Sequence, residues 1–261
     1  MTHLKTFVSF LITVTLLSGC TEKNRWELVW SDEFDYSGTP NEEFWGYETG
    51  YIRNKELQYY TDQPQNVVVE NGQCIITARL EDEDSITSAS INTRHKYDFL
   101  YGRIEVKAKI PSALGTWPAI WMLGNNRSEL GWPECGEIDI MEHVGFDPDK
   151  IHANIHTKAY NHKIKTNKGN QIEVHDPWAD FHIYALEWYE DHMDFFLDDS
   201  LYFSYQNDMT GNHDTWPFDK PHYLLLNLAY GGSWGGQQGV DTGLLPLRFE
   251  IDYVRHYRHK K

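Results

Sequence analysis

The sequence has little positive charge, few cysteines and no long helical pattern. Lysine and arginine together number 23, against 39 aspartates and glutamates, which gives a formal net charge of −16. A field of this sign repels nucleic acids and anionic membrane surfaces, so neither is an expected ligand. It also disfavours strongly sulfated polysaccharides as a global tendency. A neutral polymer is compatible with this charge.

Only three cysteines are present. In an exported protein, Cys74 and Cys135 could form a disulfide, and the sequence does not place them relative to each other. Cysteine is among the residue types most often buried as a free thiol, so we expect a buried free thiol at each position.

The first 25 residues have the pattern of an export signal rather than of a folded element. Lys5 precedes an apolar segment, 7–17, that is too short to span a bilayer comfortably. The segment ends at Leu17-Ser18-Gly19-Cys20, which resembles a bacterial lipobox. By that resemblance, 1–20 is a lipoprotein signal peptide, Cys20 becomes the lipidated first residue, and 21–25 is a polar tether. The alternative is an ordinary secretory signal in which Cys20 is incidental.

Residues 26–261 show strand patterns, with no internal repeat, low-complexity segment or interdomain linker. In the segment Tyr101 to Ile110, apolar and charged residues alternate with period two. Asn71-Gly72 lies between two apolar segments and predicts a tight hairpin turn. About a dozen short strands separated by turn signals indicate one all-β domain, a sandwich or a barrel. We expect 166–176 to be a polar loop.

Three carboxylates within six residues are the main chemical feature of the chain. Glu137, Asp139 and Glu142 alternate in part with Ile138 and Ile140, which indicates a strand with one apolar and one acidic face. Two carboxyl groups on either side of a scissile bond are the machinery of glycoside hydrolysis. The alternative is an edge strand with a solvated charged face.

Regular alternation would point Glu142 away from Glu137. A β-bulge at Ile140-Met141 corrects this, because one extra residue returns Glu142 to the face of Glu137, and bulges are common next to active sites. Their carboxyl groups could then approach the separation of about 5–5.5 Å that a retaining glycosidase needs. We expect Glu137 to be the nucleophile, Glu142 the general acid and base, and Asp139 a partner of the nucleophile. The pKa of Glu142 must be raised, and we attribute this to the negative charge of its neighbours.

The context of these acids resembles a known family. The segments 115–124 (GTWPAIWMLG) and 131–145 (GWPECGEIDIMEHVG) are similar to glycoside hydrolase family 16 of the laminarinase type, and the resemblance extends over 26–261. The inserted Met141 is typical of its bulged branch. The resemblance implies a β-jelly-roll sandwich of two curved antiparallel sheets with an open concave cleft. It also implies retaining endo-hydrolysis without a metal in the chemistry, and places His156 near the acid/base.

Further candidate residues follow from the same resemblance and from residue type. Aromatic residues make up 15% of the chain, and exposed rings can stack on the apolar face of a sugar. The candidate subsite residues are Trp117, Trp121, Trp132 and Trp234, although Trp121 could be core only. Asn66 and Arg79 could bind sugar hydroxyls, and Arg79 could equally pair with an acid. Family members often hold a structural calcium, and Glu33, Gly72 and Asp252 occupy the matching positions.

The sequence therefore predicts a monomeric endo-β-1,3-glucanase that acts on laminarin-like β-glucan, and also on mixed-linkage β-1,3/1,4-glucan. We expect it to be lipid-anchored to the bacterial cell envelope, at the outer membrane, and to touch the membrane only through that anchor. One alternative is a galactan hydrolase of the agarase or porphyranase type on the same fold. The other is a non-catalytic β-glucan-binding protein, which the intact acids disfavour.

Overall fold

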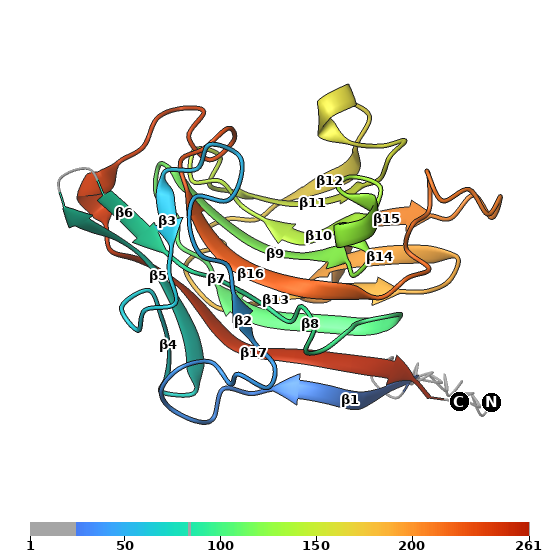
Figure 1. The fold of residues 1–261 in the computed structure, drawn as a ribbon, viewed down its shortest axis with the longest axis horizontal. Coiled ribbons are helices and arrows are strands. Elements are labelled where there is room, and N and C mark those ends of the chain that lie inside the picture. Colours follow the sequence, from blue (N-terminus) through green and yellow to red (C-terminus); the bar gives the residue numbers. More distant parts are fainter. Residues whose placement is uncertain (1–24, 83–84, 261) are drawn as a thin grey trace, which may run out of the picture.

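Two curved sheets pack face to face in the computed structural model, which describes residues 25–82 and 85–260 (Figure 1). The predicted signal peptide, Cys20 and tether residues 21–24 lie outside the described residues. Within the described part of the chain, no helix is long and apolar enough to cross a membrane.

The larger sheet has ten strands, and eight of them follow one path. In spatial order these are β15 (Ser200–Gln206), β14 (His192–Leu197), β13 (His182–Trp188), β8 (Gly102–Lys109), β17 (Leu247–His259), β5 (Gln73–Asp82), β6 (Ser85–Ser88) and β3 (Gln58–Tyr60). Off this path, β1 (Trp26–Asp32) pairs with β17 and β4 (Val67–Glu70) pairs with β5. All of these pairs are antiparallel except β3 with β6.

The second sheet has seven strands, and it carries the candidate site. Its order is β12 (Lys168–Glu173), β11 (Lys150–His156), β10 (Glu137–Glu142), β9 (Thr116–Gly124), β16 (His222–Tyr230), β7 (Ser90–Asn92) and β2 (Gly46–Tyr47). The helical segments are short: α1 (Arg127–Leu130), η2 (His162–Ile164) and η3 (Thr242–Leu244). The expected two-sheet, all-β architecture is confirmed.

One hydrophobic core lies between the two sheets, and its residues come from positions between Phe34 and Val254. On β8, Ile104, Val106 and Ala108 are fully buried, while the charged residues between them are partly exposed, as the alternation predicts. Each sheet thus contributes one apolar face to the core, which is the usual arrangement of a sandwich. On the other face of the seven-stranded sheet, the central strands β9 and β16 carry a second, smaller buried cluster. The cleft described below lies on this outer face.

The hairpin predicted at Asn71-Gly72 is confirmed. Glu70 pairs with Gln73, so the turn contains only these two residues. Both have positive φ, 54° and 77°, as a type I′ turn requires. The two remaining cysteines are also as expected, since Cys74 and Cys135 are buried free thiols. Burial raises the pKa of the Cys135 thiol to about 11, so this thiol stays protonated.

The prediction of a polar loop over 166–176 is wrong. Residues Lys168–Glu173 form β12, which pairs along its whole length with β11, from Ile155 opposite Lys168 to Lys150 opposite Glu173. Five of its six residues are exposed, so the strand has no buried face to produce an apolar alternation. It forms because its backbone groups complete the ladder at the edge of the sheet.

Candidate active site

A β-bulge in β10 sets the direction of the acidic side chains. Opposite β9, Asp139 pairs with Trp121 and Met141 pairs with Ile120, so Ile140 is the extra residue between them. Ile140 and Met141 are both fully buried in the core. Because consecutive residues both point inward, Glu142 emerges on the same side as Glu137 and Asp139. The predicted bulge at Ile140-Met141 is confirmed.

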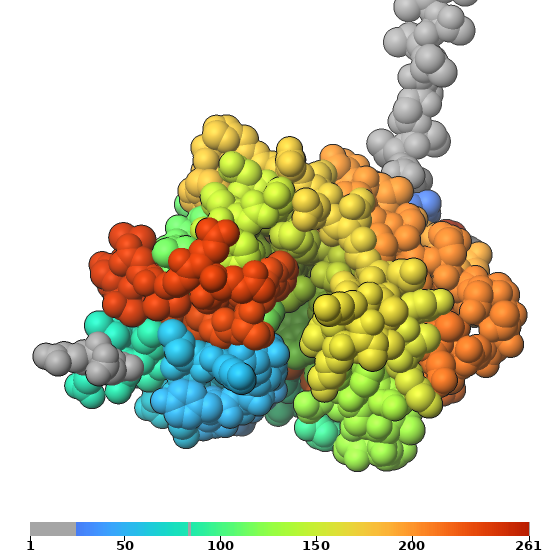
Figure 2. Space-filling view, turned by 90° about the horizontal axis from the view of Figure 1, so that it is seen from above, coloured from blue at the N-terminus to red at the C-terminus, as the bar shows by residue number. Residues whose placement is uncertain are grey.

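These acids line an open cleft of about 540 Å³ on the outer face of the seven-stranded sheet. Figure 2 shows it as a hollow between two walls. By their colours, the 233–237 and 53–56 segments form one wall, and the 127–132 and 162–167 segments form the other; each of these segments contributes lining residues. The acidic face is therefore the floor of a cleft and not a solvated edge.

A tryptophan N–H group holds each glutamate. Trp132 Nε1 donates to Glu137 Oε2 at 2.8 Å, and Trp117 Nε1 donates to Glu142 Oε1 at 3.0 Å. Asn154 on β11 adds a long contact of 3.5 Å from Nδ2 to Glu142 Oε2. Each carboxylate thus has one oxygen fixed by a donor, which orients the side chain in the cleft.

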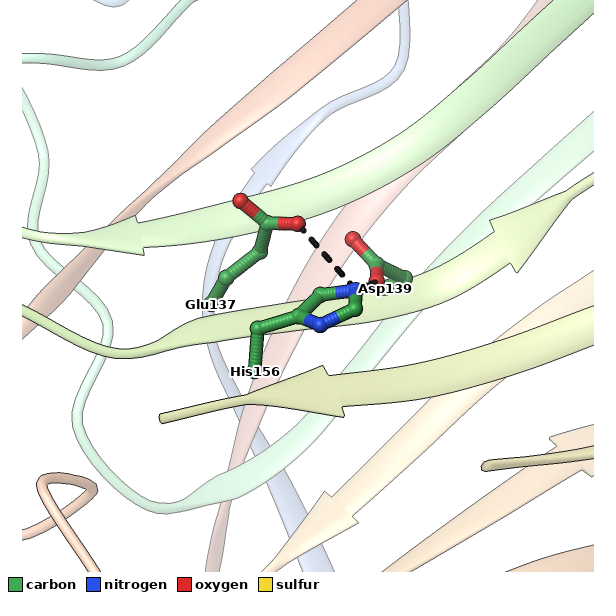
Figure 3. A group of neighbouring side chains, drawn as sticks. All are labelled: Glu137, Asp139 and His156. Atoms are coloured by element: carbon green, nitrogen blue, oxygen red, sulfur yellow. Dashed lines mark ion pairs between the residues drawn. The ribbon is translucent and has the colours of Figure 1, made fainter. Parts of the chain in front are cut away.

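His156 lies beside Glu137 and Asp139 (Figure 3). Its Nε2 is 3.6 Å from Glu137 Oε1 and 3.3 Å from Asp139 Oδ2. The position follows from register, because His156 is directly opposite Glu137 on β11, while His152 is opposite Glu142. The expected position near the acid/base is consistent with the effect of His156 on the pKa of Glu142, which it lowers. The contacts of His156 with the expected nucleophile and its partner were not predicted.

All three carboxyl groups have raised pKa values, and burial is the largest cause for each. The pKa of Glu137, of Asp139 and of Glu142 rises to about 8. For Glu142, the negative charge of Asp139 is the second cause, so the prediction that neighbouring charge dominates is corrected. His156 and the Trp132 N–H lower the pKa of Glu137 against this trend and so favour its ionised form.

The four candidate tryptophans all line the cleft, but in different ways. Trp121 is 8% exposed and donates from Nε1 to Asn227 Oδ1 at 2.7 Å, so it is a nearly buried part of the floor. Trp117 and Trp234 meet edge to face with ring centroids 5.4 Å apart at the Glu142 end. Trp132 borders the Glu137 end.

Asn66 and Arg79 are not cleft residues, so their expected contacts with sugar are wrong. Asn66 is 2% exposed, and its amide bonds Thr61, Thr87 and the carbonyl oxygen of Thr77 within the protein. Arg79 Nε lies 3.1 Å from Glu81 Oε1 in an ion pair, which was the alternative interpretation. Polar residue type alone does not reveal whether a side chain finds its partners inside the fold.

Comparison with known proteins agrees with this geometry. The family model for Glycosyl hydrolases family 16 matches residues 54–255. The chain belongs to glycosyl hydrolase family 16. A beta-glucanase from Rhodothermus marinus is 47% identical over 96% of this chain and 93% of its own length. The X-ray structure of the laminarinase from Rhodothermus marinus superposes with a TM-score of 0.87 at 48% identity, covering 90% of this chain and 98% of that one.

A third similar protein has a broader specificity. SCLam, a non-specific endo-beta-1,3(4)-glucanase, superposes with a TM-score of 0.84 at 46% identity, covering 90% of this chain and 92% of that one. The expected family is thus confirmed, and with it the jelly-roll sandwich.

Sequence reasoning missed a polar network on the family 16 cleft floor, opposite the acids. Asn227 Nδ2 donates to the Tyr60 hydroxyl, which in turn contacts Glu56 Oε2 at 3.3 Å. Glu56 also accepts from Asn54 and Gln58. The available signal was the match of the segment Asn54 to Thr61 to the family pattern, which did not single out individual residues. Arg53, also in the cleft, is ion-paired with Glu48 and lies over the Trp121 ring at 5.0 Å.

The side chains expected at the structural calcium are already engaged by protein cations. Glu33 receives two hydrogen bonds from the Arg255 guanidinium, at 2.9 and 2.7 Å. Asp252 pairs with Lys107 at 2.6 Å. These carboxylates therefore do not form a shared set of calcium ligands, and the calcium stays a prediction that depends on backbone carbonyl oxygens near Glu33, Gly72 and Asp252.

Proposed function

We infer that this protein is a retaining endo-glycosidase that hydrolyses internal β-1,3 linkages of laminarin-like β-glucan. The observation that carries the inference is the bulged strand β10, which directs Glu137, Asp139 and Glu142 into one open cleft. An open cleft accepts the middle of a polymer, so cleavage is internal. Family membership and the similarity to beta-glucanases support the same chemistry.

In the first step, Glu137 attacks the anomeric carbon while Glu142 donates a proton to the leaving glycosidic oxygen. The Trp132 N–H and His156 both favour the ionised form of Glu137. Burial and the charge of Asp139 raise the pKa of Glu142, which favours the protonated form that a general acid needs. Burial also raises the pKa of Asp139, which favours a protonated carboxyl group that can donate a hydrogen bond to the Glu137 carboxylate.

In the second step, Glu142 acts as a general base. It takes a proton from water, the water attacks the same anomeric carbon, and Glu137 leaves as a carboxylate. The Trp117 N–H bonded to Glu142 Oε1 holds this carboxylate in position in both steps. Two displacements at one carbon restore its original configuration.

We extend the proposal to mixed-linkage β-1,3/1,4-glucan. The support is the similarity to a non-specific endo-beta-1,3(4)-glucanase. A panel of laminarin, barley glucan and agarose separates the glucan activity from the galactan hydrolase alternative. Release of reducing ends from agarose alone would favour that alternative.

Loss of activity on mutation of the nucleophile is the basic test. We expect wild-type protein to release reducing sugar from laminarin, and Glu137→Ala to release none. Calorimetric binding of laminarin to both proteins is the control for folding. Equal hydrolysis by the two proteins would refute the assignment, and binding without hydrolysis by the wild type would favour the glucan-binding alternative.

The lipid anchor and the monomeric state are further parts of the proposal. Support for the anchor is the sequence Leu17-Ser18-Gly19-Cys20 at the end of a short apolar segment. Labelling cells with a radioactive fatty acid should mark the wild type and not Cys20→Ala. Fractionation of the cell envelope should find the protein in the outer membrane, and light scattering of 26–261 should give the mass of a monomer.

The structural calcium is a separate prediction. Chelation should lower the melting temperature of the protein, and an unchanged melting temperature would contradict the calcium site.

A further inference from the structure

Two cations, Arg127 and Lys163, line the same wall of the cleft at its Glu137 end. Arg127 is the first residue of α1, and Lys163 lies in η2, within the 158–168 segment. Lys163 Nζ lies 4.6 Å from the centre of the Trp132 ring, and the His162 ring lies 5.0 Å from the same ring. The end of the cleft next to the nucleophile is thus bordered by basic side chains, in a protein whose net charge is −16.

Neither cation is neutralised by the protein. Among residues 25–82 and 85–260, no carboxylate lies within ion-pair distance of Arg127 or Lys163, although Glu129 and Glu134 are in the same segment as Arg127. Other cations of the region do have partners: Lys158 pairs with Asp214 at 3.4 Å.

The glutamates that line the cleft already accept hydrogen bonds from other residues. Glu56 accepts hydrogen bonds from Asn54 and Gln58. Glu137 and Glu142 accept from tryptophan N–H groups. Arg53, the other cleft arginine, already pairs with Glu48. Arg127 and Lys163 therefore remain as the cleft cations without an anionic partner.

Both cations line the cleft, but they differ in exposure. Arg127 is half-buried and Lys163 is exposed. The charge of a half-buried cation is screened less than that of a cation on an open surface.

We propose that Arg127 and Lys163 form a subsite for an anionic group, a carboxylate or a sulfate ester, carried by the sugar unit bound at the Glu137 end of the cleft. A planar guanidinium matches either group with two parallel hydrogen bonds, and an ammonium adds a point charge. The proposal rests on the proposed glucanase function and extends its substrate class to β-glucan with sparse acidic substituents. The acidic surface elsewhere still repels a uniformly sulfated polymer.

The test compares neutral and acidic ligands of one length. Calorimetry measures binding of a β-1,3-linked glucose hexasaccharide, of the same chain with one C6 carboxylate, and of the same chain with one C6 sulfate. Glu137→Gln serves as the non-hydrolysing host. We expect it to bind at least one acidic chain about 10-fold more tightly than the neutral chain at low salt, and the preference to fall as salt rises. Preference for one acidic chain over the other distinguishes carboxylate from sulfate.

Charge removal then locates the subsite. In Glu137→Gln carrying Arg127→Gln and Lys163→Gln, the acidic-to-neutral affinity ratio should fall to about one. The matched control removes two charges from the same segment with Lys165→Gln and Lys168→Gln, which are not cleft-lining residues. The control should keep the ratio.

Three results would overturn the subsite: no acidic preference in the host, a preference that survives the Arg127 and Lys163 changes, or an equal loss in the control. Failure of the glucanase proposal is separate, because it would appear as absence of hydrolysis of neutral laminarin by the wild type.

Discussion

Replacing Glu142 with glutamine should make the protein more stable at high pH. The pKa of Glu142 rises from its ordinary value of 4.5 to about 8, mainly through burial. The folded state therefore holds this proton more tightly than the unfolded state does. The stability that the proton contributes is fully present below pH 4.5 and is lost as pH rises toward 8. A glutamine has no charge to bury, and its carbonyl oxygen still accepts the Trp117 hydrogen bond.

The expected gain is a fraction of the full shift. A pKa that moves from 4.5 to about 8 corresponds to roughly 5 kcal/mol for an isolated group. Part of that shift is repulsion from Asp139, which the two groups share, so we expect a gain of about 2 kcal/mol at pH 8. In a domain of this size, 1 kcal/mol moves Tm by about 2–4 °C, so Glu142→Gln should melt about 4–8 °C higher.

Scanning calorimetry of both proteins at pH 5 and pH 8 measures the effect. We expect nearly equal Tm values at pH 5 and the higher Tm of Glu142→Gln only at pH 8. Glu134→Gln, an acid of the neighbouring segment that does not line the cleft, should change Tm little at either pH. A Tm difference that is independent of pH, or a less stable variant at pH 8, would show that Glu142 is not a carboxyl group destabilised by burial.

Other predictions concern the hydrogen bond to the nucleophile, the buried residue Asn66 and the two thiols. Trp132→Phe removes a donor to Glu137, so the acidic limb of the kcat/KM profile should move up by about 0.5–1 pH unit; an unchanged profile would contradict that role. Asn66→Ala should reduce the free energy of unfolding by about 1–3 kcal/mol without changing KM for laminarin. A large change in KM would instead indicate that Asn66 contacts the substrate. Thiol titration of 26–261 without reductant should find Cys74 and Cys135 unreactive in the folded protein and both reactive after denaturation. Finding fewer than two thiols would indicate a disulfide.

The fold and the acidic centre could be predicted because local sequence carries their geometry. Alternation on β8 and the turn at Asn71-Gly72 each follow from one or two neighbouring residues. The bulge follows from two consecutive apolar residues, Ile140 and Met141, between acids that must share a face. In these cases the position of a side chain depends mainly on its own strand.

The rest depends on contacts between segments that are distant in sequence. β12 is exposed on nearly every residue, so only its pairing with β11 defines it as a strand. The contacts of His156 with Glu137 and Asp139 were not predicted, because the register between β10 and β11 cannot be derived from either strand alone. Asn66 has the polarity of a sugar-binding residue, yet three chain segments enclose it.

Proton NMR of the first products from a laminarin oligosaccharide tests most directly whether Glu137 and Glu142 act as a retaining pair across the anomeric carbon. Spectra recorded before mutarotation should show the β-anomer of the new reducing end. Accumulation of the α-anomer first would contradict the double displacement and the roles of both glutamates.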